Sequence, residues 1–204
     1  MSTDPGTLLV LAGPSGSGKT TLARRMVSGR SGMRFSVSTT TRKARGTEVD
    51  GVDYEFVTEA EFDRMLAAGA LAESAVVHGH RYGTTRRAIE ESARAGKDVI
   101  MDVDVQGGMS IKRLFPQSVL VFVLPPSQKV LEERLRGRAT DAPEVIETRL
   151  QNAIEELSWA PKYDYVVVNE SLDEAVRQTR VIVEAERHRA SRLAWGKPAT
   201  GASK

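Results

Sequence analysis

The sequence predicts an α/β fold in which a parallel sheet of about five strands is flanked by helices. Two observations lead to this prediction. Short runs rich in Val, Leu, Ile and Phe alternate along the chain with segments that have the length and spacing of amphipathic helices. In addition, a glycine-rich loop stands directly between the first apolar run and the first helical segment. Strands that alternate with helices in this way form a parallel sheet, because a helical crossover returns the chain to the edge where the next strand begins.

The predicted strands are short apolar runs, typical of buried strands. They cover residues 8–12, 35–37, 99–103, 119–124 and 165–168. The helical segments cover residues 19–28, 85–95, 106–114, 128–136 and 172–186. The last helix has the clearest pattern, because Ser171 and Glu174 have the spacing of a capping box. Its expected buried face consists of Leu172, Ala175, Val176, Thr179 and Val183.

Two segments interrupt the alternation of strands and helices. Residues 38–84 are rich in Arg, Gly, Asp and Tyr and contain one small helix capped at Thr58, and residues 137–143 are polar and end in Pro143. We interpret the first as a substrate-binding insertion and the second as a lid. The chain has 204 residues, so we expect a single domain. Its core is expected at residues 7–37, 85–136 and 144–194, with a disordered tail at residues 195–204.

The composition is that of a soluble globular protein. Apolar residues make up 40% of the chain and charged residues 27%, which argues against disordered and fibrous classes. The chain has no cysteine, so disulfides and thiolate chemistry are excluded. The longest aliphatic or aromatic run, residues 119–124, is far shorter than the ~20 residues of a membrane helix. The N-terminus lacks the basic segment of a signal peptide, so we expect a cytoplasmic protein with no membrane partner.

The charge distribution indicates local binding of anions. The formal net charge is only +2, but the pI is about 9.0 and arginines are clustered in several stretches. Aromatic residues are 5% of the chain and no nucleic-acid-binding motif occurs, so no nucleic-acid partner is expected. Arg187, Arg189 and Arg192 near the end are interpreted as a solvated helix tip.

Residues 13–20 carry the strongest functional signal. Their sequence, GPSGSGKT, fits the phosphate-loop pattern G-x-x-x-x-G-K-[ST] at every fixed position and lies between a strand and a helix, as that motif requires. Backbone N–H groups of such a loop converge on phosphates at a helix N-terminus. Lys19 is expected to reach the β- and γ-phosphates, and the Thr20 hydroxyl to bind Mg²⁺. A glycine-rich turn with a surface lysine is the alternative, but it would not need the Lys-Thr pair. The sequence thus predicts a P-loop NTPase-like fold whose ATP-binding residues include Gly13, Pro14, Ser15, Gly16, Ser17, Gly18, Lys19, Thr20 and Thr21.

A second anion site is indicated by two arginines in a segment too rich in Thr to be a core helix. Arg42 and Arg45 are three residues apart, and guanidinium groups bind phosphate oxygens in bidentate fashion. Tyr54 follows, and Tyr82 comes later in the same insertion. Their hydroxyl groups would complete a clamp for a monophosphate. A solvated basic loop is an equally good interpretation of these residues alone.

Two carboxylates lie at the end of the predicted strand at residues 99–103. Asp102 and Asp104 are two positions apart, so on a strand both would point to the same side. At the C-terminal edge of an open α/β sheet, that side is the ligand crevice. Asp102 is therefore expected to act on Mg²⁺ through its water shell. The alternative is a solvated strand end.

The chain resembles a bacterial guanylate kinase from Leu8 to about Leu193. The matching stretches, in order, are GPSGSGKTTL, SVSTTTRKAR, EVDGVDYEF, YGTTR, DVDVQG, ERLRGR and YDYVVVN. This resemblance implies a core, a GMP-binding insertion and a lid, and the Mg²⁺-dependent reaction of ATP and GMP to ADP and GDP. The chain departs from the family in two loops, where Gly46 lies one position early and Ala139 replaces a common glycine.

The resemblance also implies roles for single residues. Arg42, Arg45, Tyr54 and Tyr82 would hold the GMP phosphate, Ser38, Glu73 and Thr84 the guanine, and Asp104 would lie on the GMP side. The chemistry agrees, because one carboxylate can accept both N1–H and N2–H₂ of guanine while a hydroxyl satisfies O6. Without the resemblance, Glu73 is merely one acidic residue near a strand.

Phosphoryl transfer needs alignment and charge neutralisation, and it needs no general base from the protein. Besides Lys19, the predicted catalytic residues are Arg134 and Arg138, four apart on one helical face that leads into the lid, and Arg149 on the helix after it. By resemblance they close over the two nucleotides. Each could instead form a surface salt bridge with Glu133 or Glu147. Asn169 is a weaker candidate for a contact with adenine.

Two other functions remain to be weighed. One is a kinase of the same build that acts on another nucleotide or on a phosphorylated sugar. The other is a protein-binding module, because some guanylate-kinase-like domains bind protein partners. Such domains typically lack a complete phosphate loop, and the complete loop in this chain favours the enzyme.

Overall fold

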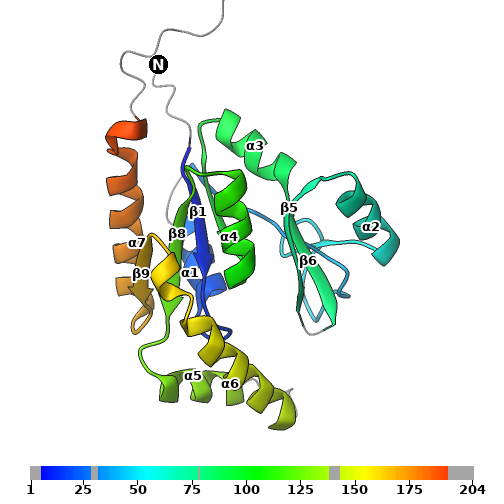
Figure 1. Ribbon diagram of the computed structural model, residues 1–204, viewed down its shortest axis with the longest axis vertical. Coiled ribbons are helices and arrows are strands. Elements are labelled where there is room, and N and C mark those ends of the chain that lie inside the picture. The colour runs from blue at the N-terminus through cyan, green and yellow to red at the C-terminus, as the bar shows by residue number, and fades with distance from the viewer. Residues whose placement is uncertain (1–5, 29–31, 78, 138–142, 193–204) are drawn as a thin grey trace, which may run out of the picture.

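The main sheet of the molecule has five parallel strands (Figure 1). The computed structural model describes residues 6–28, 32–77, 79–137 and 143–192. Within them the strand order is β2-β7-β1-β8-β9, and every pairing in this sheet is parallel. The strands are β1 (Leu8–Ala12), β2 (Met33–Phe35), β7 (Asp98–Asp102), β8 (Val119–Leu124) and β9 (Tyr165–Val168). The predicted α/β class with a parallel sheet is confirmed.

Helices α1 (Lys19–Ser28) and α7 (Leu172–Arg187) cover one face of the main sheet, and α3 (Arg86–Arg94) and α4 (Val105–Leu114) cover the other. Helices α5 (Gln128–Arg136) and α6 (Pro143–Leu157) pack mainly against each other, and the 3₁₀ turns are η1 (Ala160–Lys162) and η2 (Ala190–Arg192). Leu9 and Leu11 of β1 pack with buried residues of α1 and α7, whereas Val10 packs with those of α3 and α4. Side chains alternate between the two faces along a strand, so burial on both sides explains why these strands are continuous apolar runs.

A second sheet of four strands stands beside the first (Figure 1). Its order is β4-β3-β6-β5, and its elements are β3 (Thr39–Thr40), β4 (Glu55–Phe56), β5 (Leu71–Val77) and β6 (His80–Thr85). Helix α2 (Glu59–Ala67) packs on it through Phe62, which is fully buried. Thr58 and Glu61 form the capping box of α2, so the predicted small helix is confirmed. This sheet lies within the segment predicted as the insertion, and β5 packs against α4 of the core.

The predicted strand at residues 35–37 is wrong. The observed strand, Met33–Phe35, begins and ends two residues earlier. It is an edge strand, so the charged Arg34 can point to solvent while Met33 is buried, and this pattern hid the strand from a search for apolar runs. Ser36 donates a last hydrogen bond to Ile100 (2.9 Å) before the chain leaves for the second sheet.

The start and end of α7 also differ from the expectation. Its buried face is confirmed, but the Ser171 side chain makes no capping bond, and the Glu174 carboxylate accepts hydrogen bonds from Arg177 and Gln178. The C-terminal arginines were expected in solvent, and this is wrong for two of them. Arg187 pairs with the buried Asp98, and the buried side chain of Arg192 lies 3.5 Å from the carboxylate of Glu186.

Glu186 is buried at the end of α7 and lies at the centre of a cluster of polar and charged side chains. It accepts a hydrogen bond from the Tyr165 hydroxyl (2.7 Å) and pairs with Arg189 (3.3 Å) as well as Arg192. Because an unpaired buried charge is strongly unfavourable, the arginines around Glu186 stabilise the C-terminal end of the fold. Their function is therefore structural.

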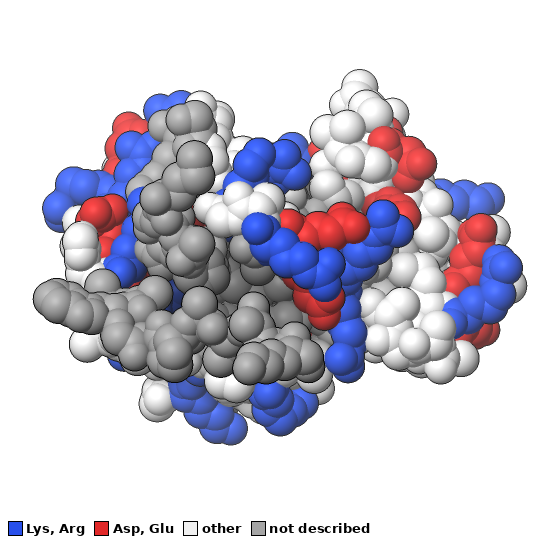
Figure 2. All heavy atoms as spheres, turned by 90° about the horizontal axis from the view of Figure 1, so that it is seen from above, with Lys and Arg blue, Asp and Glu red and all other residues white. Residues whose placement is uncertain are grey.

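Charges of both signs are mixed on the face shown in Figure 2. Helix α3 illustrates the mixing, because Arg87 pairs with Glu91 (2.7 Å) and Arg94 with Glu90 (3.0 Å). Such exposed pairs contribute little to stability, and they lower the local net charge. In the part of the chain that the structure describes, no helix is both long and apolar enough to cross a membrane.

Candidate active site

The phosphate loop connects β1 to α1 at the C-terminal edge of the main sheet. Gly13 and Gly18 both have positive φ angles (132° and 92°). A Cβ atom on Gly13 would lie 2.4 Å from the Val123 carbonyl oxygen, and one on Gly18 would lie 2.3 Å from Nδ2 of Asn169. The loop is thus pressed against β8 and against the residue after β9, and only glycine fits at these two positions.

Lys19, Thr20 and Asp102 lie at the start of α1 and the end of β7. The Lys19 ammonium donates to the carbonyl oxygens of Gly13 (2.7 Å) and Pro14 (3.1 Å) of its own loop. The Thr20 hydroxyl donates to the Asp102 carboxylate, so the two predicted Mg²⁺ ligands are brought together. Both supply the hard oxygen donors that Mg²⁺ prefers, and a site completed by water and phosphate oxygens needs few protein ligands.

Asn169 braces the phosphate loop. It is buried, and its Nδ2 donates to the Ser17 carbonyl oxygen (2.8 Å) while its own backbone carbonyl accepts a bond from Arg134 (3.1 Å). One residue therefore ties the phosphate loop to the end of β9 and to α5. The predicted adenine contact of Asn169 stays a prediction, and the salt bridge weighed for Arg134 with Glu133 is replaced by this bond to a carbonyl.

Arg42 is the best-connected residue of the second anion site. Its guanidinium forms a bidentate pair with Glu48, in which Nη1 and Nη2 each donate to a carboxylate oxygen at 2.9 Å. Nη1 also donates to the Lys43 carbonyl (2.7 Å) and Nε to the Tyr82 hydroxyl (3.3 Å). The hydrogen bonds to Glu48 raise the pKa of Arg42 and lower that of Glu48. Arg42 is only 6% exposed, so the alternative of a solvated basic loop is wrong for this residue.

Aromatic rings surround the Arg42 guanidinium. Its Cζ atom lies 5.1 Å from the ring centroid of Tyr54 and 5.8 Å from that of Phe56. The Tyr54 ring in turn contacts the Tyr82 ring edge-to-face, with centroids 5.9 Å apart. Burial raises the pKa of Tyr54, so its hydroxyl stays protonated and able to donate. The structure therefore gathers three of the four predicted phosphate ligands, and the fourth, Arg45, is exposed nearby and donates its backbone N–H to Glu48 (2.8 Å).

Glu73 and Thr84 face each other across β5 and β6. The fully buried Thr84 hydroxyl donates to Oε1 of Glu73 (2.7 Å), and Glu73 is 8% exposed. Burial raises the pKa of Glu73 to about 7. A Cβ atom on Gly107, in the first turn of α4, would lie 3.1 Å from Glu73 Oε2 and 3.2 Å from Asp104 Oδ1. The carboxylate of the second sheet thus reaches the helix that follows β7 in the core.

Asp104 does not share a strand with Asp102. Strand β7 ends at Asp102, and Asp104 is the N-cap of α4, where its side chain accepts the N–H of Gly107 (2.6 Å). The sequence argument that treated the two carboxylates as alternate positions along one strand is therefore wrong. Capping of α4 explains an aspartate at this position without any ligand.

Glu156 is a site residue that the sequence analysis missed. It lies on α6 and accepts a hydrogen bond from the backbone N–H of Ser15, close to Lys19 and Asp104. Burial raises the pKa of this carboxyl, and the Lys19 charge opposes the rise. It stands seven residues after Arg149, a spacing that places both on one face of a helix and could have drawn attention to it. Glu48, three residues after Arg45, was missed in the same way.

The remaining predicted residues differ in exposure and in whether the structure describes them. Arg138 and most of the predicted lid lie outside the described residues, as does the predicted tail at residues 195–204. Arg149 is half-buried on α6. Ser38 is half-buried, and its carbonyl accepts a bond from the N–H of Glu55 (2.9 Å). Thr21 is exposed beside Thr20.

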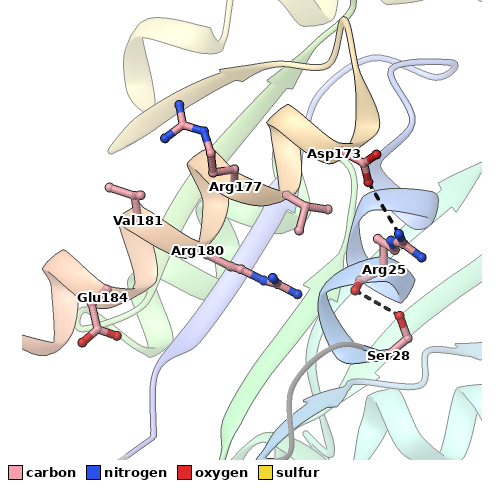
Figure 3. Close-up of a pocket in the computed structure, with 8 residues that line it drawn as sticks. Arg25, Ser28, Asp173, Arg177, Arg180, Val181 and Glu184 are labelled. Carbon is pink, nitrogen blue, oxygen red and sulfur yellow. Dashed lines mark hydrogen bonds and ion pairs between the residues drawn. The ribbon is translucent and has the colours of Figure 1, made fainter.

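An open recess of about 860 Å³ lies between α1 and α7, away from all of these groups (Figure 3). It is lined by Arg25, Ser28, Asp173, Val176, Arg177, Arg180, Val181 and Glu184. Arg25 pairs with Asp173 (3.5 Å), and Arg177 pairs with Glu174 (2.6 Å). Because the recess is at the end of α1 opposite to the phosphate loop, it is not part of the candidate active site.

Comparisons with known proteins agree with these features. A family model described as guanylate kinase matches residues 5–186. The guanylate kinase of Syntrophotalea carbinolica is 50% identical over 92% of this chain and 90% of its own length, and that of Polaromonas sp. is 48% identical over 90% and 89%. The crystal structure of guanylate kinase from Anaplasma phagocytophilum matches with a TM-score of 0.78 at 33% identity, covering 94% of this chain and 92% of that chain.

Proposed function

Because the chain belongs to the guanylate kinase family and phosphorylates GMP to GDP with ATP, we propose that its phosphate loop holds ATP and its second sheet holds GMP. The observation that carries this division is the buried Glu73 carboxylate held by Thr84. A carboxylate fixed in a buried place can accept both N1–H and N2–H₂ of guanine, and adenine offers neither donor at these positions.

On the ATP side, the backbone N–H groups at the start of α1 bind the phosphates, helped by the positive end of the helix dipole. The Lys19 ammonium, held by two loop carbonyls, follows the charge as it moves to the leaving oxygen. Asn169 and Glu156 keep the loop in shape from two sides. We assign Thr20 and Asp102 to Mg²⁺, which when bound neutralises charge on the phosphate oxygens.

On the GMP side, Arg45, Tyr54 and Tyr82 bind the phosphate together with Arg42. The Thr84 hydroxyl has a single proton, and in this structure it donates its one hydrogen bond to Glu73. It can therefore orient Glu73 or donate to guanine O6, and the second role requires the hydroxyl to rotate. Ser38 remains a proposed guanine contact.

The transferring phosphoryl group is bound between the two sides. We propose that Arg134, Arg138 and Arg149 neutralise its charge when residues 137–143 close as a lid over the core. Closure excludes water, which would otherwise accept the phosphoryl group and hydrolyse ATP. The reaction is placed in the cytoplasm, where both nucleotides are available.

The test is coupled detection of ADP formation with GMP, AMP and a phosphorylated ribose offered separately. The proposal expects GMP to be used far better than the others, by ~10⁴-fold over AMP. Equal use of AMP would refute the acceptor assignment. A folded protein that binds nucleotides without forming ADP would instead indicate a protein-binding module.

A further inference from the structure

The Arg42 guanidinium has almost no donors left for a substrate. Arginine has five N–H groups, one on Nε and two on each Nη nitrogen. Nε contacts Tyr82, Nη1 contacts both Lys43 and Glu48, and Nη2 contacts Glu48. Four of the five are thus engaged, and the remaining Nη2–H has no partner among the described residues.

Glu48 holds both arginines of the predicted clamp at once. Its Oε1 and Oε2 accept the two prongs of Arg42, and Oε2 also accepts the backbone N–H of Arg45 (2.8 Å). The Glu48 N–H donates back to the Arg45 carbonyl (3.0 Å), which closes the turn between them. One carboxylate therefore sets the orientation of a side chain and the path of the loop that carries the other arginine.

Burial makes this contact difficult to replace. Arg42 is 6% exposed and the Glu48 side chain 26%, so the pair is partly withdrawn from water. Removing one member of such a pair leaves an uncompensated charge. The rings of Tyr54 and Phe56 limit where the guanidinium could move. Protein groups alone therefore hold the Arg42 guanidinium in this orientation.

We propose that Glu48 is a positioning residue for GMP, which holds Arg42 so that it directs a single N–H at the phosphate and leaves the flexible contacts to Arg45. This inference rests on the proposed function of the second sheet. Glu48 itself touches no substrate, since its oxygens are occupied by the two arginines. It lowers the reorganisation that GMP binding requires, because the donors are already in place.

The test compares Glu48→Gln with Glu61→Gln, a matched control that removes a carboxylate from the capping box of α2 in the same sheet region. Glu48→Gln should raise KM for GMP by about tenfold or more, with KM for ATP changed by less than about twofold. Glu61→Gln should leave both constants unchanged. An unchanged KM for GMP in Glu48→Gln would overturn the inference, and a lowered one would show that Glu48 competes with the phosphate.

Two further variants separate positioning from loss of fold. Glu48→Asp keeps the charge on a shorter side chain and should give an intermediate KM for GMP, so it serves if Glu48→Gln does not fold. In an Arg42→Lys background the effect of Glu48→Gln should shrink, since the fork is already lost. Full additivity there would contradict action through Arg42. Failure of the wild-type protein to use GMP would refute the proposed function, whereas wild-type use of GMP with additive variants would refute this inference alone.

Discussion

At the scale of single residues, the site depends on carboxylates whose hydrogen bonds are already made. Glu73 accepts the Thr84 hydroxyl, Glu48 accepts the Arg42 fork, and Glu156 accepts an N–H of the phosphate loop. Each is buried to a degree that makes an empty hydrogen-bonding position unfavourable. Burial raises the pKa of Glu73, whereas the hydrogen bonds from Arg42 lower the pKa of Glu48.

The titration of Glu73 predicts the acid side of the pH profile. Burial raises its pKa to about 7, and only the ionised form accepts both guanine donors. As pH falls through 7, the free protein loses that form, so kcat/KM for GMP should fall about tenfold per pH unit. Saturating GMP favours the ionised form, so kcat itself should begin to fall only at lower pH.

The measurement is kcat/KM for GMP from about pH 5.5 to about 8.5 in the wild type and in Glu73→Gln. The GMP phosphate also titrates near pH 6, and the variant corrects for this because it keeps the phosphate and lacks the carboxylate. An acid limb near pH 7 in the wild type alone is expected. Identical limbs in both proteins would contradict the assignment.

Selectivity for the base should also depend on Glu73. Glu73→Gln can accept one donor through its amide carbonyl, but its NH₂ group cannot accept the second. The variant should weaken GMP use markedly and narrow its preference over AMP, because the carboxylate that repels the N1 lone pair of adenine is gone. The ratio of kcat/KM for GMP and AMP in the two proteins decides this, and an unchanged ratio would remove Glu73 from base recognition.

At the scale of secondary structure elements, the phosphate loop is held from three sides. Val123 of β8 contacts Gly13, Asn169 after β9 bonds Ser17, and Glu156 of α6 bonds Ser15. The loop therefore depends on the strands next to it and on α6. Its shape depends on elements far away in the sequence, because Asn169 is 152 positions after Ser17.

Asn169→Ala should loosen this support. It removes a buried hydrogen bond to the Ser17 carbonyl, so the free energy of unfolding should fall by about 1–3 kcal/mol. KM for ATP should rise while KM for GMP stays nearly constant, since the loop contacts only the donor. Chemical denaturation and steady-state kinetics test both effects. Asn152→Ala, the same change at an exposed position of α6, should do neither, and equal effects in the two variants would contradict the brace.

How well the sequence predicted each element depended on where it lies in the fold. Strand β8 and helices α1 and α5 matched their predictions, because a fully apolar run and helices of clear length and periodicity need no distant partner to be recognised. The strands of the second sheet were not predicted. β3 is only Thr39–Thr40 and pairs with β6 more than forty residues later, so nothing in its local pattern marks it. A short polar strand is specified by its partner.

At the scale of the whole molecule, the site combines groups from two sheets and from the helices around the predicted lid. The motifs along the chain predicted the phosphate loop and the two arginines, and the resemblance to guanylate kinases predicted that Glu73 binds guanine. Neither could predict that Asp104 would cap α4 or that Arg187 would pair with Asp98, because these contacts depend on how the layers pack. Thr20 and Asp102 were both assigned to Mg²⁺ at the C-terminal edge of the sheet, and the structure brings the two side chains together.

The proposed division into lid arginines and arginines that bind the GMP phosphate predicts opposite kinetic effects for Arg149 and Arg45. Arg149→Ala, on α6, should lower kcat more than it raises KM for GMP, because a lid group acts mainly in the closed, charge-developing state. Arg45→Ala, on the exposed loop of the second sheet, should raise KM for GMP and change kcat little. Steady-state kinetics with GMP varied at saturating ATP separates the two effects. The reverse partition would reject the division into lid and clamp.

The lack of a side chain at Gly107 affects how residues 38–84 could be exchanged between related proteins. A Cβ atom at Gly107, in the first turn of α4, would lie 3.1 Å from Glu73 Oε2, so a larger residue there requires the carboxylate to shift by a few tenths of an ångström. The position of Glu73, within residues 38–84, therefore depends on a residue of a core helix. When this segment is transferred to a related core, a glycine at the matching helix position is expected to keep the carboxylate in place.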